Sequence, residues 1–207
     1  MRETPEQLKA LIDRAYKDIN SAAILAEQDP KRPMYHFRSP SQWMDDPNGG
    51  LWHNGYYHMF YCWNPNSYAQ RAGMVYKTAE RVWDPDSEDW TGGIGVWGHA
   101  RSKDLIHWEH LPIAIFPQIE KGEHFIWFGC VRVNKRGLPI AFYTAVGPDR
   151  RPEDTADQWV ALGDKDLINW QPYENNPVLT YSLNGDTRLG EWRDPFIFEE
   201  NGNTYLI

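Results

Sequence analysis

The sequence is poor in cysteine and has no long apolar run. Its two cysteines, Cys62 and Cys130, belong to no Cys-x-x-Cys motif and to no histidine-rich segment. Such cysteines predict free thiols in a reducing compartment rather than a disulfide framework or a metal site. The longest uncharged apolar stretch, residues 111–119, contains two prolines and is far shorter than the ~20 residues of a membrane-spanning helix. We therefore predict neither a membrane span nor a bound metal.

Basic residues are also in deficit. The 21 Lys and Arg residues face 29 Asp and Glu residues, which gives a formal net charge of -8, and no basic cluster stands out. This balance argues against a nucleic-acid or anionic-membrane partner. The first thirty residues carry six acidic side chains and no continuous apolar stretch, so they do not resemble a secretory signal. A cytoplasmic location is the resulting expectation.

Aromatic residues, in contrast, are abundant. They make up 14% of the 207 residues, with 11 Trp and 11 Tyr, more indole than the packing of a core of this size requires. Flat apolar rings with a polar edge are suited to interfaces and to sugar rings. The composition thus favours a globular protein that contacts carbohydrate.

The N-terminal segment has the pattern of an amphipathic helix. Thr4 can cap a helix whose first turn contains Pro5, and apolar residues then recur at spacings of three and four until Asp29 and Pro30. We predict that residues 1–31 form a helical extension that covers part of a main body spanning residues 32–207.

Beyond residue 33 the pattern becomes that of a β domain. Short aromatic and β-branched runs flank an Asn-Gly pair at residues 54–55 and another at 201–202. Asn-Gly tolerates the positive φ angles of a type I′ turn, so each pair predicts a β-hairpin. Each hairpin also follows an Asp-Pro pair, at residues 46–47 and 194–195.

A six-residue repeat adds to this picture. Residues 103–108 (Lys-Asp-Leu-Ile-His-Trp) recur as residues 165–170 (Lys-Asp-Leu-Ile-Asn-Trp), 62 positions later. This spacing holds about four short strands, the content of one β-propeller blade. Asp104 and Asp166 occupy the same place in both copies and are expected to hold a turn. The chain would supply about two and a half blades and be a fragment of a longer protein.

Two carboxylates are the candidates for chemistry. Asp46 precedes a proline and two glycines, which bend the chain, and Asp194 lies beside Arg193. If equivalent positions of successive blades point to the propeller axis, both carboxylates reach one central pocket, with Trp43 and Trp192 near it. Paired carboxylates among indoles are typical of glycoside hydrolysis.

Three ordered motifs resemble the N-terminal propeller of glycoside hydrolase family 32, the invertases, fructan hydrolases and sucrose-6-phosphate hydrolases. Residues 43–49 (Trp-Met-Asp-Asp-Pro-Asn-Gly) are similar to the family's Trp-Met-Asn-Asp-Pro-Asn-Gly. Residues 97–108 resemble its Trp-Gly-His-Ala motif with the following Ser, Asp-Leu and Trp, and residues 193–195 resemble its Arg-Asp-Pro. The resemblance implies an incomplete five-bladed β-propeller, all-β apart from the N-terminal helix.

The resemblance also implies roles for individual residues. Asp46 takes the place of the nucleophile of a retaining mechanism, and Asp194 that of the residue that grips fructosyl hydroxyls and steadies the transition state. The substrate-binding positions would be Trp43, Asp45, Asn48, Cys62, Trp127, Phe128 and Arg193. The family's acid/base glutamate belongs to a Glu-Cys-Pro motif that this sequence lacks, so the fragment alone should be inactive.

Three positions depart from the family pattern. Asp45 replaces an Asn beside the nucleophile, Cys62 stands where the family has a substrate-binding Gln, and Phe128 lies near the place of a Ser. Either a changed sugar specificity or a loss of activity explains these departures.

The sequence therefore predicts a retaining glycosidase that hydrolyses β-fructofuranosides, such as sucrose, sucrose 6-phosphate or fructans, without a metal or organic cofactor. Two alternatives remain open at this point. One is a related propeller glycosidase acting on arabinose- or xylose-type glycans, and the other is a propeller that binds carbohydrate without cleaving it. The sequence does not define an oligomeric state.

Overall fold

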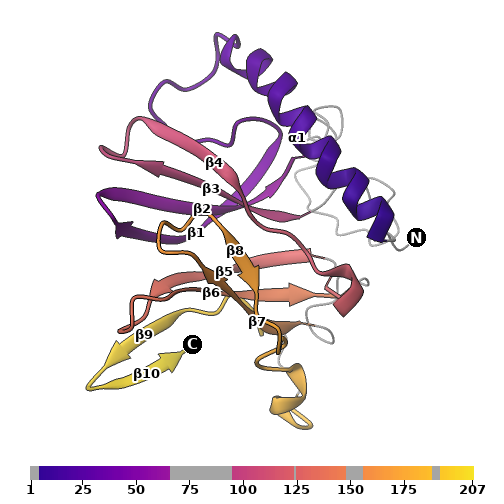
Figure 1. The fold of residues 1–207 in the computed structure, drawn as a ribbon, viewed down its shortest axis with the longest axis vertical. Coiled ribbons are helices and arrows are strands. Elements are labelled where there is room, and N and C mark those ends of the chain that lie inside the picture. Colours follow the sequence, from indigo (N-terminus) through magenta and orange to yellow (C-terminus); the bar gives the residue numbers. More distant parts are fainter. Residues whose placement is uncertain (1–4, 66–94, 124, 148–155, 188–191) are drawn as a thin grey trace.

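The computed structural model describes residues 5–65, 95–123, 125–147, 156–187 and 192–207 (Figure 1). Within these ranges one α-helix precedes ten β-strands. The helix is α1 (Pro5–Glu27), and the strands are β1 (Trp43–His53), β2 (Tyr56–Asn64), β3 (Val96–Ser102), β4 (Trp108–Ile115), β5 (Phe125–Val133), β6 (Pro139–Val146), β7 (Asp157–Gly163), β8 (Trp170–Pro172), β9 (Ile197–Glu200) and β10 (Asn203–Leu206). Two short 3-10 helices, η2 (Ile119–Lys121) and η3 (Tyr181–Asn184), lie between strands. No helix in the described part of the chain is long and apolar enough to cross a membrane.

The strands form two four-stranded antiparallel sheets and one hairpin. The first sheet has the order β1-β2-β3-β4, the second β5-β6-β7-β8, and β9 pairs with β10. Strands adjacent in sequence are therefore adjacent in space, and Figure 1 shows the two sheets side by side with the hairpin next to the second sheet. This confirms the prediction that the chain beyond its N-terminal helix is predominantly β.

Helix α1 confirms the predicted N-terminal helix. Ala15 is fully buried, and Ile12 and Ile19 pack against an apolar cluster that contains Tyr61 and Trp63 of β2. The helix thus covers one face of the first sheet because its apolar residues recur on one side. Thr4, the predicted cap, lies outside the described residues, and the domain boundary at residue 31 stays a prediction.

Both predicted Asn-Gly hairpins are present. Asn54 and Gly55 have φ angles of 48° and 82° between β1 and β2, and Asn201 and Gly202 have φ angles of 50° and 81° between β9 and β10. Two consecutive residues with positive φ are the signature of a type I′ turn, whose twist matches that of the strands.

The six-residue repeat forms the same turn twice, between β3 and β4 and between β7 and β8. Leu105 and Leu167 take left-handed φ angles of 65° and 62°. The indole of Trp108 donates to the Leu105 carbonyl oxygen at 3.2 Å, and that of Trp170 donates to the Leu167 carbonyl oxygen at 2.7 Å. The repeat therefore marks equivalent corners of successive sheets.

The predicted carboxylate holds the first of these two turns, but a different carboxylate holds the second. In the first turn Asp104 Oδ1 accepts hydrogen bonds from the amides of Ile106 and His107 at 2.9 and 2.8 Å, as expected. In the second turn Asp164, not Asp166, accepts from the amides of Ile168 and Asn169 at 2.9 and 3.1 Å. The expectation for Asp166 was wrong because Asp164, two positions earlier, supplies the acceptor.

The first strands of successive sheets lie beside one another. The Gly129 amide of β5 donates to Asn48 Oδ1 of β1 at 3.3 Å, and the Ile197 amide of β9 donates to Cys130 Sγ of β5 at 3.4 Å. A core that includes Phe60, Trp97, Tyr143 and Trp170 fills the space between the two sheets. The side-by-side placement of β1, β5 and β9 is the arrangement expected of radially repeated sheets.

The outer corners of the two sheets are also joined. His53 Nε2 and Asn54 Nδ2, at the tip of the first hairpin, lie 2.7 and 3.0 Å from the Lys165 carbonyl oxygen, at the corner of the second sheet. Because a carbonyl oxygen only accepts, His53 Nε2 carries the proton in this contact.

Candidate acidic site

Asp45 and Asp46 lie in a register shift of β1. Met44 pairs with Trp63 and Pro47 pairs with Tyr61, so two residues on β1 oppose the single residue Cys62 on β2. Such a bulge turns side chains away from the regular alternation of the strand. Both carboxylates are exposed.

The second sheet contains the same shift at the matching place. Ile126 pairs with Ala145 and Gly129 pairs with Tyr143, so Trp127 and Phe128 together oppose Thr144. The two bulges and the residues opposite them are each separated by 82 positions, from 45 to 127 and from 62 to 144. The sequence analysis missed both bulges, and the only local signal was the Asp-Pro pair at residues 46–47.

Asp194 lies in the segment that leads into β9, and its backbone is unusual. Its φ angle is 63°, in the left-handed region that non-glycine residues rarely occupy, although Asp tolerates it better than most. The Asp194 amide donates to Thr144 Oγ1 at 2.8 Å. Asp194 Oδ2 lies 3.8 Å from Arg193 Nε, and the Arg193 guanidinium lies 5.3 Å from the centre of the Trp127 ring. Segment 192–194 thereby rests on the bulge of β5.

The acidic residues of β1 and of segment 192–194 surround one thiol. The pKa of Cys62 is raised to about 12, mainly by burial and also by the negative charges of Asp45, Asp194 and Asp46, whereas the hydrogen bond with Asn48 lowers it. The charges act on this thiol because all three carboxylates lie near it. The structure thus brings Asp46 and Asp194, 148 positions apart in the sequence, to the surroundings of one side chain.

Asn48 and Cys62 lie beneath this acidic surface. Asn48 is 1% exposed and Cys62 is 7% exposed. Asn48 Nδ2 donates to Cys62 Sγ at 3.4 Å, and turned over, the same amide would accept from the Cys62 amide and the Trp97 indole at 3.3 Å each. In either orientation the amide is used inside the protein. The substrate-binding roles predicted for Asn48 and Cys62 stay predictions.

The remaining predicted residues lie around the carboxylates. Trp43, Trp127, Phe128 and Trp192 are all half-buried. Phe128 packs against the core between the sheets, and the Trp192 ring lies 5.8 Å from the ring of Tyr181. The Trp97 indole donates to the Trp127 carbonyl oxygen at 2.9 Å, which fixes the bulge of β5 from the first sheet.

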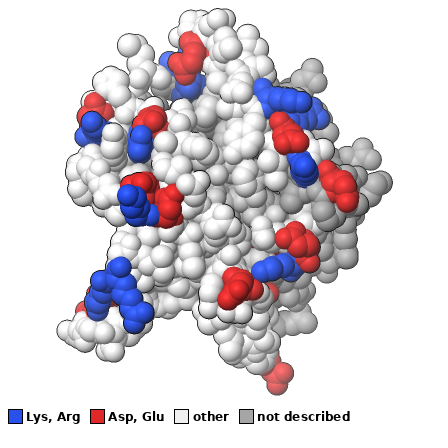
Figure 2. All heavy atoms as spheres, viewed as in Figure 1, with Lys and Arg blue, Asp and Glu red and all other residues white. Residues whose placement is uncertain are grey.

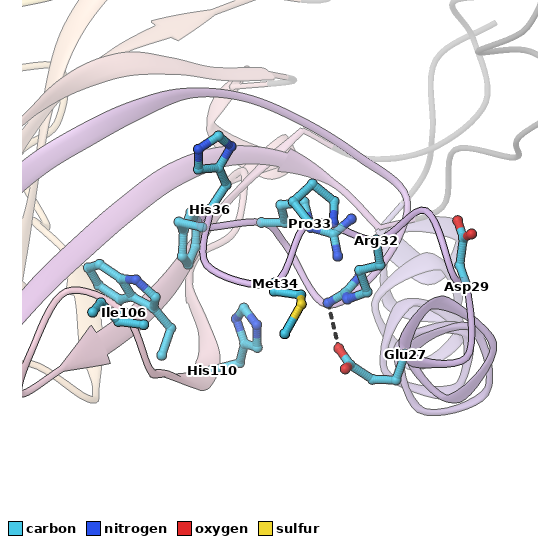
Figure 3. A pocket seen from close by; sticks show the side chains of 11 residues that line it. Glu27, Asp29, Arg32, Pro33, Met34, His36, Ile106 and His110 are labelled. Carbon is cyan, nitrogen blue, oxygen red and sulfur yellow. Dashed lines mark ion pairs between the residues drawn. The ribbon is translucent and has the colours of Figure 1, made fainter.

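A pocket of about 300 Å³ lies elsewhere, beside the end of α1 (Figure 3). In this pocket Arg32 Nη2 pairs with Glu27 Oε1 at 2.6 Å. Its lining residues are Glu27, Asp29, Arg32, Pro33, Met34, His36, Phe37, Arg38, Ile106, Trp108 and His110. None of the predicted site residues lines this pocket, so it is distinct from the acidic site.

The charged side chains on one face of the molecule are of both signs. Acidic and basic side chains are interspersed on the face drawn in Figure 2 and form no broad region of one sign there. Among the described residues, no group of three or more His, Cys, Asp or Glu side chains could hold a metal ion.

Comparison with known proteins extends this description of an antiparallel β-sheet protein with carboxylates on β1 and in the segment before β9. The sequence model "Glycosyl hydrolases family 32 N-terminal domain" matches residues 36–80 and 82–207. An acid β-fructofuranosidase from Capsicum annuum is 32% identical over 81% of this chain and 24% of its own length. A fructan 6-exohydrolase from Beta vulgaris is 30% identical over 86% of this chain and 26% of its own length.

A solved structure shows the same likeness in three dimensions. A mutant of a Bombyx mori family 32 β-fructofuranosidase in complex with sucrose matches with a TM-score of 0.65 and 27% identity, over 99% of this chain and 36% of that chain. The chain belongs to glycosyl hydrolase family 32. Residues 36–80 and 82–207 match the N-terminal domain of that family. It spans about a quarter of the length of the curated relatives it matches.

Proposed function

We propose that the complete protein is a glycosidase that hydrolyses β-fructofuranosides such as sucrose, sucrose 6-phosphate or fructans. The relatives named above are a β-fructofuranosidase and a fructan exohydrolase, and the solved relative is a complex with sucrose. On this proposal the two sheets and the hairpin are about two and a half blades of a five-bladed propeller, which further chain completes.

The observation that carries the proposal is the placement of Asp46 in the bulge of β1 opposite Cys62, and of Asp194 against the neighbouring bulge of β5 through its hydrogen bond to Thr144. Both carboxylates are exposed, so a sugar can reach them. The half-buried indoles of Trp43 and Trp127 offer apolar faces to the ring, and Arg193 lies against one of them. A carboxylate pair with indoles nearby suits a fructosyl unit.

In the reaction that we propose, an Asp46 carboxylate oxygen attacks the anomeric carbon. A carbon–oxygen bond forms to Asp46 while the glycosidic bond breaks, and the leaving oxygen takes a proton from an acid. Water then displaces the carboxylate from the same carbon and gives a proton back to the deprotonated acid, so the sugar leaves with retained configuration. Asp194 holds fructosyl hydroxyls and stabilises the positive charge that develops on the ring.

The acid is not among the residues of this chain. The family's acid/base glutamate lies in a Glu-Cys-Pro motif, and both cysteines here follow other residues, Tyr61 and Gly129. We infer that a segment outside these 207 residues supplies it and that the chain by itself does not turn over substrate.

Substrate profiling of the complete protein tests the proposal. We expect hydrolysis of sucrose and 1-kestose, with β-fructofuranose as the first product seen by NMR, and little activity on aryl arabinofuranosides or xylosides. Preferred cleavage of the arabinoside or xyloside would indicate the related glycosidase. Sugar binding without turnover, unchanged by Asp46→Asn, would indicate a carbohydrate-binding propeller and contradict an enzymatic role.

A further inference from the structure

We propose that Thr144 and Gln158, two buried polar residues of the second sheet, are positioning residues for Asp194. The inference rests on the proposed function of the acidic site. Thr144 is fully buried and Gln158 is 3% exposed, and they pair directly across β6 and β7. Most buried polar side chains have a hydrogen-bond partner, so the partners of Thr144 and Gln158 indicate their role.

A chain of three hydrogen bonds links these residues to segment 192–194. Thr144 Oγ1 lies 3.0 Å from Gln158 Oε1 and accepts from the Asp194 amide at 2.8 Å. At the other end, Gln158 Nε2 donates to the Trp192 carbonyl oxygen at 3.1 Å. The segment is thus tied to the sheet on both sides of Arg193.

The direction of each hydrogen bond follows from chemistry. A carbonyl oxygen only accepts, so the amide nitrogen of Gln158 must face the Trp192 carbonyl oxygen. Gln158 Oε1 then faces Thr144, whose hydroxyl must donate to it. The Thr144 oxygen keeps a lone pair for the Asp194 amide, and every group in the chain is satisfied in one arrangement only.

The backbone of Gln158 is held as firmly as its side chain. Its amide donates to the Leu179 carbonyl oxygen at 2.8 Å, and its carbonyl oxygen accepts from the Val178 amide at 3.0 Å. Thr144 in turn faces the bulge formed by Trp127 and Phe128. The relay therefore connects Asp194 to rigid strands rather than to a loop.

The consequence is a fixed left-handed backbone at Asp194. A φ of 63° is sparsely populated for a residue with a Cβ, and the hydrogen bond to Thr144 holds the amide in that orientation. A displacement of about 1 Å at a reacting site can cost on the order of 100-fold in rate. Loss of the relay should therefore lower kcat more than it raises KM.

Hydrogen exchange of the complete protein tests the positioning directly. We expect the Asp194 amide, in a peptide spanning residues 192–197, to be protected in the wild type and in Thr144→Ser, which keeps the hydroxyl. In Thr144→Val, which keeps the shape but not the hydroxyl, exchange should be at least about tenfold faster. Tyr143→Phe is the matched control, because it removes a buried hydroxyl from the next residue of β6 and should leave the Asp194 amide protected.

Kinetics on sucrose add the functional readout. Thr144→Val and Gln158→Leu should lower kcat by about 10- to 100-fold with KM within about threefold, and Thr144→Ser should restore most of kcat. Equal exchange of the Asp194 amide in Thr144→Val and wild type would overturn the inference, whether or not the protein cleaves sucrose. Faster exchange with unchanged kcat would overturn the link to catalysis. A wild type that protects Asp194 but leaves fructosides intact would instead contradict the proposed function.

Discussion

The two sheets share a backbone plan but carry different chemistry on it. The first strand of each sheet, β1 or β5, contains a two-residue bulge at the same place. Each sheet also has a corner where a leucine takes a left-handed φ, of 65° in the first sheet and 62° in the second. The bulge of β1 presents two carboxylates, whereas that of β5 presents Trp127 and Phe128. Opposite them lie a thiol in the first sheet and a hydroxyl that holds Asp194 in the second. The comparison teaches that strand pairing sets where side chains leave the sheet, and that residue identity decides what they do there.

Replacing Asp46 is the strongest test of the proposal that the first sheet supplies the nucleophile. In the complete protein, Asp46→Asn should lower kcat on sucrose by at least about 10⁴-fold, because the amide oxygen is a poor nucleophile. The melting temperature should change little, since Asp46 is exposed. Asp166→Asn, which changes an exposed carboxylate at a sheet corner, serves as control and should keep wild-type kcat. A variant at position 46 that keeps more than a hundredth of the activity would refute the role.

Gly129, which follows the bulge of β5, tests how tightly the two bulges constrain the chain. A Cβ here would collide with the Phe142 carbonyl oxygen and approach Tyr143 Cα to 2.7 Å. Gly129→Ala should therefore destabilise the protein by about 3 kcal/mol in urea unfolding. Gly50→Ala is the control in the first sheet, because a Cβ there meets nothing within 4 Å. Equal stability of the two variants would show that β5 can shift at no cost.

Replacement by glycine should affect stability differently at the two left-handed leucines. Leu167 is fully buried and Leu105 is 52% exposed. Leu167→Gly loses a core side chain, and relief of the left-handed backbone only partly offsets that, so we expect a net loss of about 2 kcal/mol. Leu105→Gly loses little burial and should lie within about 1 kcal/mol of wild type on either side. Thermal unfolding of both variants measures the difference, and similar values would contradict it.

Glu123 should make the stability of the protein depend on pH. Glu123 precedes β5 and is 1% exposed; burial raises its pKa to about 8 from 4.5, against the hydrogen bond from the Gln118 amide. The folded state therefore keeps a proton that the unfolded state releases. This contribution to stability is complete below pH 4.5 and is lost as the pH rises through about 8.

Chemical denaturation between pH 5 and 9 measures this effect. We expect the stability of the wild type relative to Glu123→Gln, which cannot titrate at this position, to fall by more than about 1 kcal/mol over that range. Ser41, 82 positions earlier before β1, is likewise buried but carries no titratable group. Ser41→Ala should keep the wild-type slope, and a slope unchanged in Glu123→Gln would assign the dependence to other groups.

The features that the sequence predicts are those built from neighbouring residues. The Asn-Gly hairpins, the helix and the repeated corner each need only local chemistry. The acidic pair was also predictable, because Asp-Pro recurs at residues 46–47 and 194–195. That Asp46 and Asp194 both lie near Cys62 depends on how β1, β5 and β9 pack, which the sequence does not reveal.

The bulges and the hydroxyl relay were not predictable for the same physical reason. The residues at the two bulges, Asp-Asp and Trp-Phe, share no chemistry, and the shift exists only in the pairing with β2 and β6. Thr144 lies 50 residues from Asp194, and nothing near it signals a partner. Asp164 took the role expected of Asp166 because the corner selects the carboxylate by geometry rather than by its place in the repeat.

The contact of His53 and Asn54 with the Lys165 carbonyl oxygen bears on how this protein can be divided. The tip of the first hairpin has its partner on the second sheet, and the two sheets also share one core. If the chain were cut between β4 and β5, the first sheet alone would expose its side of the shared core. His53 and Asn54 would also lose the carbonyl oxygen that they contact. We therefore expect the two sheets to unfold in a single cooperative transition, and excision of either one to yield an insoluble product.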